Sequence, residues 1–279
     1  MSILEVKGVR KVYVPRFGGS QVEALKNVTF SVEEGEYVSI MGESGSGKTT
    51  LLNILAALDR PTGGVVLLDG QDLTKIREDR VAAFRRDCLG FVFQEFNLLD
   101  TFTIEDNILL PLVLANKPYS QMQKRLAPLA EQLGITDLLK KYPYEISGGQ
   151  KQRAAVARAL IAGPRLVLAD EPTGALDSRA TDELLRLFEQ VNRAGQTILM
   201  VTHDVEFAAE NADRCALFFD GEVLSADVPE RFFAENNFYT TAANRLARSF
   251  WKNAVTCKQV VEYARAALRR PTGEGGETE

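Results

Sequence analysis

The stretch that most constrains this chain is Gly42-Glu43-Ser44-Gly45-Ser46-Gly47-Lys48-Thr49. It fits the phosphate-loop pattern G-x-x-x-x-G-K-[ST] without a mismatch. An apolar, strand-forming segment (37–41) precedes it and a helical run (50–58) follows it, which is the context that the pattern requires. A flexible Gly/Ser loop is the alternative, and these flanks argue against it. The sequence therefore predicts a strand, a phosphate loop and a helix within an α/β fold.

The residues of this loop predict a nucleotide-triphosphate site. Glycines let consecutive backbone N–H groups turn toward the phosphates, and the following helix offers its positive N-terminus. Lys48 is expected to reach the β- and γ-phosphates and the Thr49 hydroxyl to coordinate the metal. The predicted cofactors are ATP and Mg²⁺. The predicted ligands in this part of the chain are Gly42, Ser44, Gly45, Ser46, Gly47, Lys48, Thr49 and Thr50.

Composition and charge exclude several classes of protein. The 279 residues are 45% hydrophobic and 25% charged, which suits a globular chain with a substantial core. A net charge of −5 argues against nucleic acid as the main partner. No apolar run approaches the ~18 residues that span a bilayer, and no signal pattern opens the chain, so we expect a cytoplasmic protein. The three cysteines are far apart and are expected to be reduced packing thiols.

Polar side chains follow three buried strands, at the edge where open α/β sheets bind ligands. Asp170 and Gln94 are predicted to hold Mg²⁺, and Gln94 could instead bind the attacking water. Glu171 is positioned to act as general base, and His203, the only histidine, is expected to contact the γ-phosphate. Taken singly, Gln94 could be a solvated polar residue, Asp170 and Glu171 could cap a helix, and His203 could be structural. We predict Glu171, His203 and Gln94 as the catalytic residues.

Residues from about 100 to 160 predict a helical subdomain. The segment is rich in Leu and Ala and is interrupted by Pro111, Pro118, Pro128 and Pro143. It contains a second Gly-rich helix start, and a helix start with free N–H groups is an anion site. Two such sites about a hundred residues apart suggest that each ATP is shared. The predicted nucleotide ligands here are Ser147, Gly148, Gly149 and Gln150.

Tyr13 lies just before a surface loop, 15–20. Its ring could stack on adenine, and a buried strand tyrosine is the alternative that position alone leaves open. Alternating apolar residues at 3–7 and 28–32 predict half-exposed strands, and 215–224 predicts a closing hairpin.

Taken in order, the phosphate loop, Gln94, the segment 146–150, Asp170-Glu171, the segment 174–177 and His203 resemble the nucleotide-binding subunit of ATP-binding-cassette (ABC) transporters over about residues 1–225. The resemblance implies a P-loop NTPase core of ABC type with an antiparallel β subdomain and a helical subdomain. It also implies an ATPase that pairs head to tail with a second copy around two ATP molecules and powers a membrane permease.

Further roles follow from the same resemblance. Asp177 is expected to be a nucleotide-site residue at the dimer seam, where it communicates between the two ATP sites. Ile146 stands where the family usually has leucine, and we expect little effect. The permease would hold this subunit at the inner face of the cell membrane.

Several segments look like the branch of lipoprotein-release, macrolide-export and antimicrobial-peptide-resistance ATPases. The segments 97–101, 107–112 and 174–177 are most similar to the bacitracin-resistance type. That type partners a ten-helix permease and often a sensor kinase. The resemblance implies export or detoxification of antimicrobial peptides or lipid-linked substrates. A regulatory role, in which ATP binding signals through the sensor, is compatible with it.

Residues 226–279 are predicted to be a helical, basic C-terminal extension with a disordered acidic end at 273–279. The segment 231–248 resembles one in energy-coupling-factor importers, which makes an ATPase for vitamin or metal uptake an alternative. A helix is predicted over 253–268, and we favour a solvated basic face over membrane-surface binding. An alternative from a different functional class is a soluble ABC ATPase with a regulatory or nucleic-acid role. The single cassette in the chain and its net negative charge argue against that role.

Overall fold

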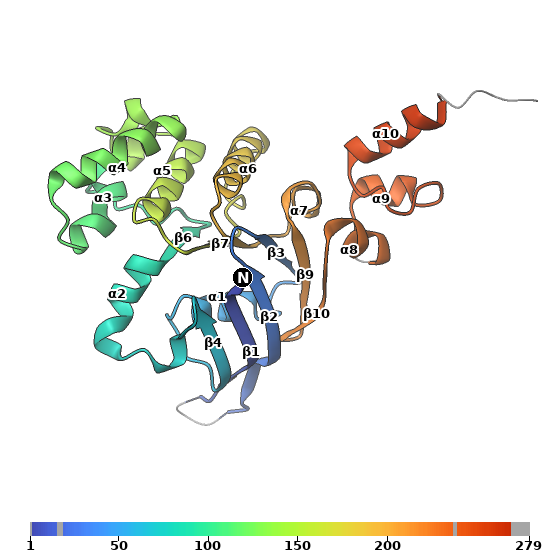
Figure 1. Cartoon of the computed structure of the whole chain (residues 1–279), viewed down its shortest axis with the longest axis horizontal. Helices are drawn as coiled ribbons and strands as arrows, with labels where there is room; N and C mark the ends of the chain where they lie inside the picture. The colour runs from blue at the N-terminus through green and yellow to red at the C-terminus, as the bar shows by residue number, and fades with distance from the viewer. Residues whose placement is uncertain (1, 16–18, 237–238, 269–279) are drawn as a thin grey trace, which may run out of the picture.

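The computed structural model describes residues 2–15, 19–236 and 239–268. Figure 1 shows the strands gathered at the centre of the molecule, with helices on both sides of them. In chain order the elements are β1 (Ser2–Tyr13), β2 (Val22–Glu33), β3 (Tyr37–Met41), α1 (Lys48–Leu55), β4 (Gly63–Leu68), β5 (Gln71–Asp72), α2 (Glu78–Cys88), β6 (Leu89–Phe93), α3 (Ile104–Leu114), α4 (Tyr119–Gln132), α5 (Gly148–Leu160), β7 (Leu166–Asp170), α6 (Ser178–Arg193), β8 (Ile198–Val201), α7 (Val205–Asn211), β9 (Arg214–Phe219), β10 (Glu222–Asp227), α8 (Pro229–Glu235), α9 (Ala242–Ala247) and α10 (Cys257–Leu268).

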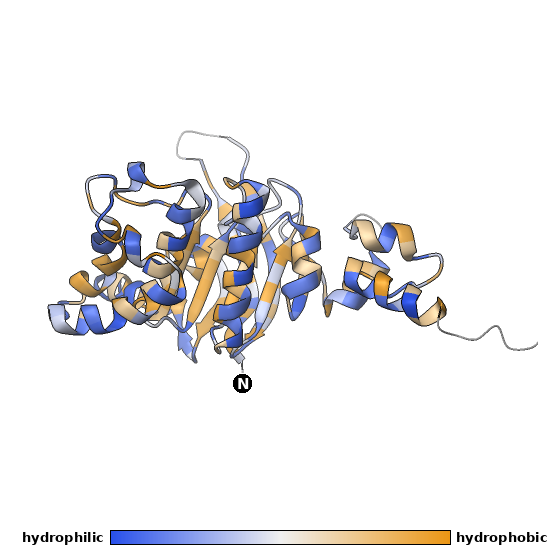
Figure 2. Cartoon of the chain, turned by 90° about the horizontal axis from the view of Figure 1, so that it is seen from above, coloured by the Kyte–Doolittle hydropathy of each residue, from blue (hydrophilic) through white to orange (hydrophobic). Residues whose placement is uncertain are grey.

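A six-stranded sheet in the order β10-β9-β3-β8-β7-β6 forms the centre of the molecule. Strands β9, β3, β8, β7 and β6 run parallel, and β10 returns beside β9 as the predicted hairpin. Strands β3 and β8 are buried along their whole length. Such continuous apolar strands are stable only when both faces of the sheet are covered. Figure 2 shows the apolar residues concentrated on these strands.

The second sheet is the predicted antiparallel β subdomain, with strand order β2-β1-β4-β5. Helix α1 lies between the two sheets, and its Leu51, Leu52, Ile54 and Leu55 join one buried cluster with residues of both. Apolar burial on this scale contributes roughly 25 cal/mol per Å² to folding. The helix that follows the phosphate loop is therefore fixed from two sides.

The helical subdomain consists of α3, α4 and α5 and packs on the other face of the central sheet. Two of its prolines, Pro111 and Pro128, lie inside α3 and α4 instead of ending them. Buried neighbours such as Leu112 and Leu126 hold these helices against the core. Tertiary packing thus outweighs the local cost of a proline in a helix.

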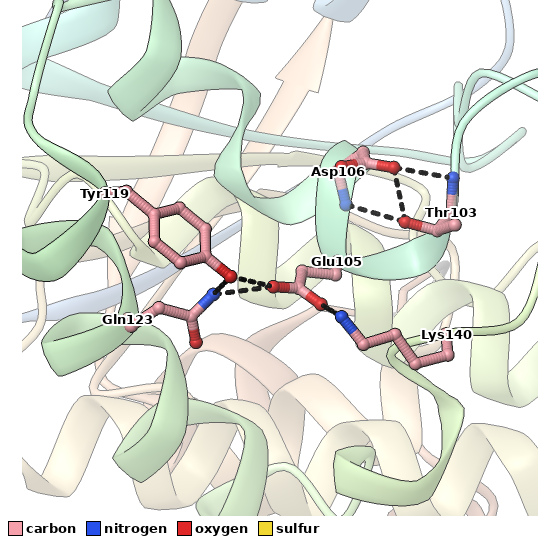
Figure 3. A network of polar contacts seen from close by, with 6 residues as sticks. All are labelled: Thr103, Glu105, Asp106, Tyr119, Gln123 and Lys140. Carbon is pink, nitrogen blue, oxygen red and sulfur yellow. Dashed lines mark hydrogen bonds and ion pairs between the residues drawn. The ribbon is translucent and has the colours of Figure 1, made fainter.

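A polar network holds the helical subdomain together (Figure 3). The carboxylate of Glu105 in α3 is buried, accepts a 2.6 Å hydrogen bond from Gln123 Nε2 in α4 and forms an ion pair with Lys140. The hydroxyl of Tyr119 lies 3.4 Å from the same carboxylate. In addition, the backbone N–H of Glu105 donates to the carbonyl of Leu139 at 2.9 Å. These bonds connect α3 and α4 to the segment that leads to Ser147.

The tail, defined here as residues 229–236 and 239–268, contains α8, α9 and α10. It lies beside the β9–β10 edge of the sheet, on the opposite side of the molecule from α3 and α4 (Figure 1). The helix predicted from 253 begins at Cys257, because Thr256 caps it: Thr256 Oγ1 accepts from Gln259 N at 3.2 Å and Gln259 Oε1 accepts from Thr256 N at 3.0 Å. The predicted acidic end, 273–279, lies outside the described residues.

Candidate functional site

The phosphate loop connects β3 to α1 and depends on its glycines. Gly47 has a φ of +107°, a conformation that side chains rarely adopt. A Cβ atom on Gly47 would lie 2.5 Å from the carbonyl oxygen of Ala24, and one on Gly42 would lie 2.0 Å from that of Phe218. Neither position can carry a side chain. The sequence pattern therefore reflects how closely β2 and β9 approach the loop.

Lys48, the first residue of α1, extends along the inside of the loop. It is 5% exposed, and its Nζ donates to the carbonyls of Gly42 at 2.9 Å and Glu43 at 2.7 Å. Burial lowers the pKa of the Lys48 ammonium, and the charges of Glu171 and Asp170 oppose this effect. The lysine and the two carboxylates therefore face the same space, although they are more than a hundred residues apart in the sequence.

The register of the central sheet brings the predicted strand-end residues side by side. Phe93 pairs with Asp170, and Asp170 pairs with Val201. Gln94, Glu171 and His203 follow these paired positions at one edge of the sheet. The amide of Gln94 also reaches across to the loop after β7, because a Cβ on Gly174 would lie 2.7 Å from its Nε2.

Glu171 is held in an unusual conformation next to His203. Its φ is +45°, which is uncommon for a non-glycine residue and costs of the order of 1–3 kcal/mol. Its Oε1 lies 2.9 Å from Nε2 of His203, and its backbone N–H donates to the carbonyl of Val201 at 2.9 Å. The strained backbone turns the carboxylate away from the strand and toward the histidine.

The donors near Asp170 suit a magnesium ion that is shared with phosphates. Burial and the Glu171 charge raise the pKa of Asp170, and Lys48 lowers it. No cluster of three or more acidic, histidine or cysteine side chains able to hold a metal occurs in residues 2–15, 19–236 and 239–268. Mg²⁺ typically needs only one or two carboxylates when substrate phosphates complete its shell. Asp170, the Thr49 hydroxyl and the Gln94 amide oxygen fit that requirement.

The Ser46 hydroxyl also fits a phosphate ligand. Its oxygen is buried and has no hydrogen-bond partner among the described groups of the chain. Buried polar atoms without partners are rare in folded proteins and call for an explanation. A site built to receive phosphate oxygens supplies one.

A second cluster lies at the start of α5 and α6. Ser147 caps α5 by accepting from Gln150 N at 3.4 Å, and Gln150 Oε1 accepts from Ser147 N at 3.0 Å. Asp177 caps α6 by accepting from Ala180 N at 2.8 Å. A Cβ on Gly149 would lie 2.9 Å from Cβ of Ala180, so the two helix starts touch. No hydrogen bond or ion pair in the described parts of the chain joins this cluster to the phosphate loop.

Tyr13 is 41% exposed at the end of β1, so the alternative of a buried strand tyrosine is wrong. Its hydroxyl donates to Oδ2 of Asp59 at 2.8 Å, and Nζ of Lys11 lies 4.8 Å from its ring centroid. Burial and the bond to Asp59 raise the pKa of the Tyr13 hydroxyl, and Thr50 in α1 is near enough to oppose this shift. The ring therefore stands beside the phosphate-loop helix, and stacking on adenine stays a prediction.

Sequence reasoning missed two residues of α5 that support the site. Gln152 is fully buried, and its Nε2 donates to the carbonyl of Pro172 at 2.7 Å, just after Glu171. Arg158 donates to the carbonyls of Phe96 and Asn97, which both have positive φ. The signal available in the sequence was two long polar side chains in an Ala-rich helix. Arg158 thus holds the loop that follows Gln94.

A groove of about 390 Å³ opens beside that loop, between α2, α3, α5 and β6. Its walls are mainly apolar, with Arg85, Arg86 and Arg158 among them.

None of the helices in the described part of the chain combines the length and the apolar character that a membrane-spanning helix requires.

Comparisons with known proteins agree with this geometry. The family model described as ABC transporter matches residues 25–174. The chain is 46% identical over 226 residues to the bacitracin export ATP-binding protein BceA of Halalkalibacterium halodurans, which covers 81% of this chain and 88% of that protein. It is 46% identical over 208 residues to the macrolide export ATP-binding/permease protein MacB of Brucella melitensis biotype 1, covering 75% of this chain but only 32% of the relative.

Two solved structures are similar over most of the chain. The dimeric, post-hydrolysis structure of the ATP-binding cassette MJ0796 with ADP and Pi has a TM-score of 0.73 and 38% identity, and covers 81% of this chain and 98% of that one. The structure of cbiO1 from Clostridium perfringens, part of the ABC transporter complex cbiONQ, has a TM-score of 0.76 and 26% identity. That match covers 90% of this chain and 96% of cbiO1, so it extends into the tail.

Proposed function

This chain belongs to the ABC transporter family of ATP-binding proteins and is an ATPase, and from this premise we propose that it powers the export of antimicrobial peptides or lipid-linked substrates. The similarity to a bacitracin export ATP-binding protein along 88% of that protein's length supports the substrate class. The observation that carries the chemistry is the 2.9 Å contact between Glu171 and His203 at the strand edge that faces Lys48.

The residues of the phosphate loop and of the strand edge beside it have distinct tasks in hydrolysis. Lys48 binds the β- and γ-phosphates, and the loop amides beside it hold the remaining phosphate oxygens. Glu171 accepts a proton from the attacking water, while His203 orients the Glu171 carboxylate and contacts the γ-phosphate. Thr49, Asp170 and Gln94 would hold Mg²⁺, which neutralises charge on the phosphates.

The second cluster fits a partner copy of the chain. Ser147 and Asp177 are exposed at neighbouring helix starts, and among the residues that the structure describes no hydrogen bond joins them to the phosphate loop of their own chain. Free N–H groups at a helix start attract phosphate. The MJ0796 cassette, which is dimeric in a post-hydrolysis state, supports the inference that Ser147, Gly148 and Gly149 complete the ATP site of the second copy.

We propose the groove at β6 as the contact for a membrane permease. The groove adjoins the loop that follows Gln94, and Arg158 holds that loop in place. A permease segment bound in the groove would therefore lie close to a predicted Mg²⁺ ligand. MacB is named as an ATP-binding and permease protein in one, which supports a permease partner for this chain. Such a partner would keep the chain at the inner face of the membrane.

Uptake is the second candidate function, and one observation favours it. The segment 231–248 of the tail resembles one in energy-coupling-factor importers of vitamins and metals.

Isolation of the tagged chain from detergent-solubilised membranes, followed by identification of the membrane protein that accompanies it, distinguishes these functions. A permease of about ten helices supports export. A small substrate-binding membrane protein with a separate coupling subunit would overturn export in favour of uptake. Recovery without any membrane protein, even with ATP trapped by Glu171→Gln, would contradict both.

A further inference from the structure

A hydrophobic cluster joins the tail to the short helix that follows His203. The tail contributes Phe232 and Phe233, which are 4% and 0% exposed, and Val255, which is fully buried. Helix α7, β3 and β9 contribute the residues that these side chains cover, namely Ala208, Ala209, Ala212, Met41 and Cys215. The small alanines let α8 approach α7 closely. The tail therefore packs as part of the ATPase core.

A polar contact fixes the first turn of α7 to the same segment. Oε1 of Glu206 accepts a hydrogen bond from the backbone N–H of Ala242 at 2.6 Å, where α9 begins. Glu206 is three residues after His203. Between them, Asp204 caps α7 by accepting from the N–H of Phe207 at 3.0 Å. The bond to the tail thus lies within one turn of the predicted γ-phosphate contact.

The part of the tail that holds α7 has an ordered polar interior. Thr240, Thr241 and Asn244 are 0–2% exposed. Thr240 Oγ1 donates to the carbonyl of Phe233 at 2.8 Å, and Thr241 Oγ1 donates to that of Val255 at 2.6 Å. Buried networks whose members are all bonded are rigid. Residues 233–236 and 239–255 can therefore serve as a fixed support, in contrast to α10, which has no buried residue.

Helix α7 needs such a support because it has only seven residues. Helices of this length are not stable by themselves in water. On its sheet side, the thiol of Cys215 lies 3.7 Å from the carbonyl of Ala208. Phe207 anchors α7 in the core cluster that includes Leu185 of α6, with its ring centroid 6.0 Å from that of Tyr37. The remaining buried face of α7, at Ala208 and Ala209, packs in the cluster that contains the tail.

We propose that the tail positions His203 by holding α7, and that Glu206 is a positioning residue for ATP hydrolysis. The proposal rests on the proposed role of His203. Met41, the residue before Gly42, belongs to the same buried cluster, so the phosphate loop and His203 share one support. By this proposal the tail contributes to ATP hydrolysis, because it keeps His203 in position.

The test compares three variants of the full chain in steady-state ATP hydrolysis. Glu206→Ala removes the acceptor for Ala242, whereas Glu206→Gln keeps an oxygen at the same position. Glu210→Ala, at an exposed position of the same helix, is the matched control for loss of one carboxylate. We expect Glu206→Ala to lower kcat about two- to tenfold, as the loss of one hydrogen bond allows, with KM for ATP unchanged. Glu206→Gln should restore kcat, and Glu210→Ala should match the wild type.

The His203→Ala background separates positioning from general weakening of the fold. If Glu206 acts through His203, Glu206→Ala has no further effect on kcat once His203 is removed. An equal loss in both backgrounds, or equal kcat for Glu206→Ala and Glu210→Ala, would overturn the proposal. If His203→Ala itself hydrolyses ATP at the wild-type rate, the proposed role of His203 fails, and with it the premise of this inference.

Discussion

Nε2 of His203 lies 2.9 Å from Oε1 of Glu171, although the two residues follow different strands. The contact exists because β7 and β8 are parallel neighbours and because Glu171 adopts a φ of +45°. A strained residue at the end of a buried strand indicates a position set by function more than by stability. The predictions below follow from this edge of the sheet and from the elements that support it.

Asp170→Asn should stabilise the chain in the absence of nucleotide. Burial, followed by the Glu171 charge, raises the pKa of Asp170 above its usual value. A carboxyl whose pKa is raised by folding costs stability once it ionises, so its ionised form destabilises the chain at neutral pH. We expect a higher Tm at pH 7 for the variant, a smaller difference as the pH falls through the raised pKa, and loss of Mg²⁺-dependent hydrolysis. A lower Tm at pH 7 would contradict this account of the site.

As the pH rises, ATP affinity should begin to decline before the pH reaches the usual pKa of a lysine side chain. Burial lowers the pKa of Lys48, while Glu171 and Asp170 oppose the shift. Phosphates bind the protonated lysine, so affinity is complete below this lowered pKa and is lost as the pH rises through it. Calorimetric titration with ATP at increasing pH measures this decline, together with proton uptake on binding. A Kd that stays constant up to the range where exposed lysines titrate would show that Lys48 does not contact the phosphates.

Glu105→Ala should lower the free energy of unfolding by about 1–3 kcal/mol, because it leaves the groups that Glu105 joins without their shared acceptor. Glu105 is 7% exposed and connects Gln123 with Lys140. Glu131→Ala, at an exposed position of α4, is the matched control and should change stability by less than about 0.5 kcal/mol. Urea denaturation of the two variants measures both values. Equal stabilities would mean that the network in Figure 3 does not stabilise the helical subdomain.

The local patterns in the sequence predicted the elements but not all of their contacts. The phosphate loop and the apolar strands are short-range signals, and a parallel sheet necessarily brings strand ends such as those before Gln94 and Glu171 to one edge. Alternation and turn residues likewise predicted the strands at 3–7 and 28–32 and the closing hairpin, whereas the antiparallel subdomain was expected only from the resemblance to ABC ATPases. These features require no knowledge of distant residues.

What the sequence could not supply depends on partners far away in the chain. Pro111 stays within α3 because of packing against α5, and Arg158 crosses to a loop 61 residues earlier. Tyr13 could not be assigned to the surface from its position alone. The tail packs on α7 through side chains such as Phe233 and Ala208. Residues of these types occur in the core of any globular protein, so the sequence does not show which of them are in contact. Only the fold shows that they meet.

The measurement that tests the central claim most directly is ATP hydrolysis by Glu171→Gln. The substitution keeps the shape of the side chain but removes the base, so we expect hydrolysis to slow by about 10²- to 10⁴-fold. ATP binding should remain, and ATP should hold the variant as a dimer, which light scattering can detect. Hydrolysis by Glu171→Gln at the wild-type rate would contradict the assignment of Glu171 as general base and, with it, the proposed mechanism.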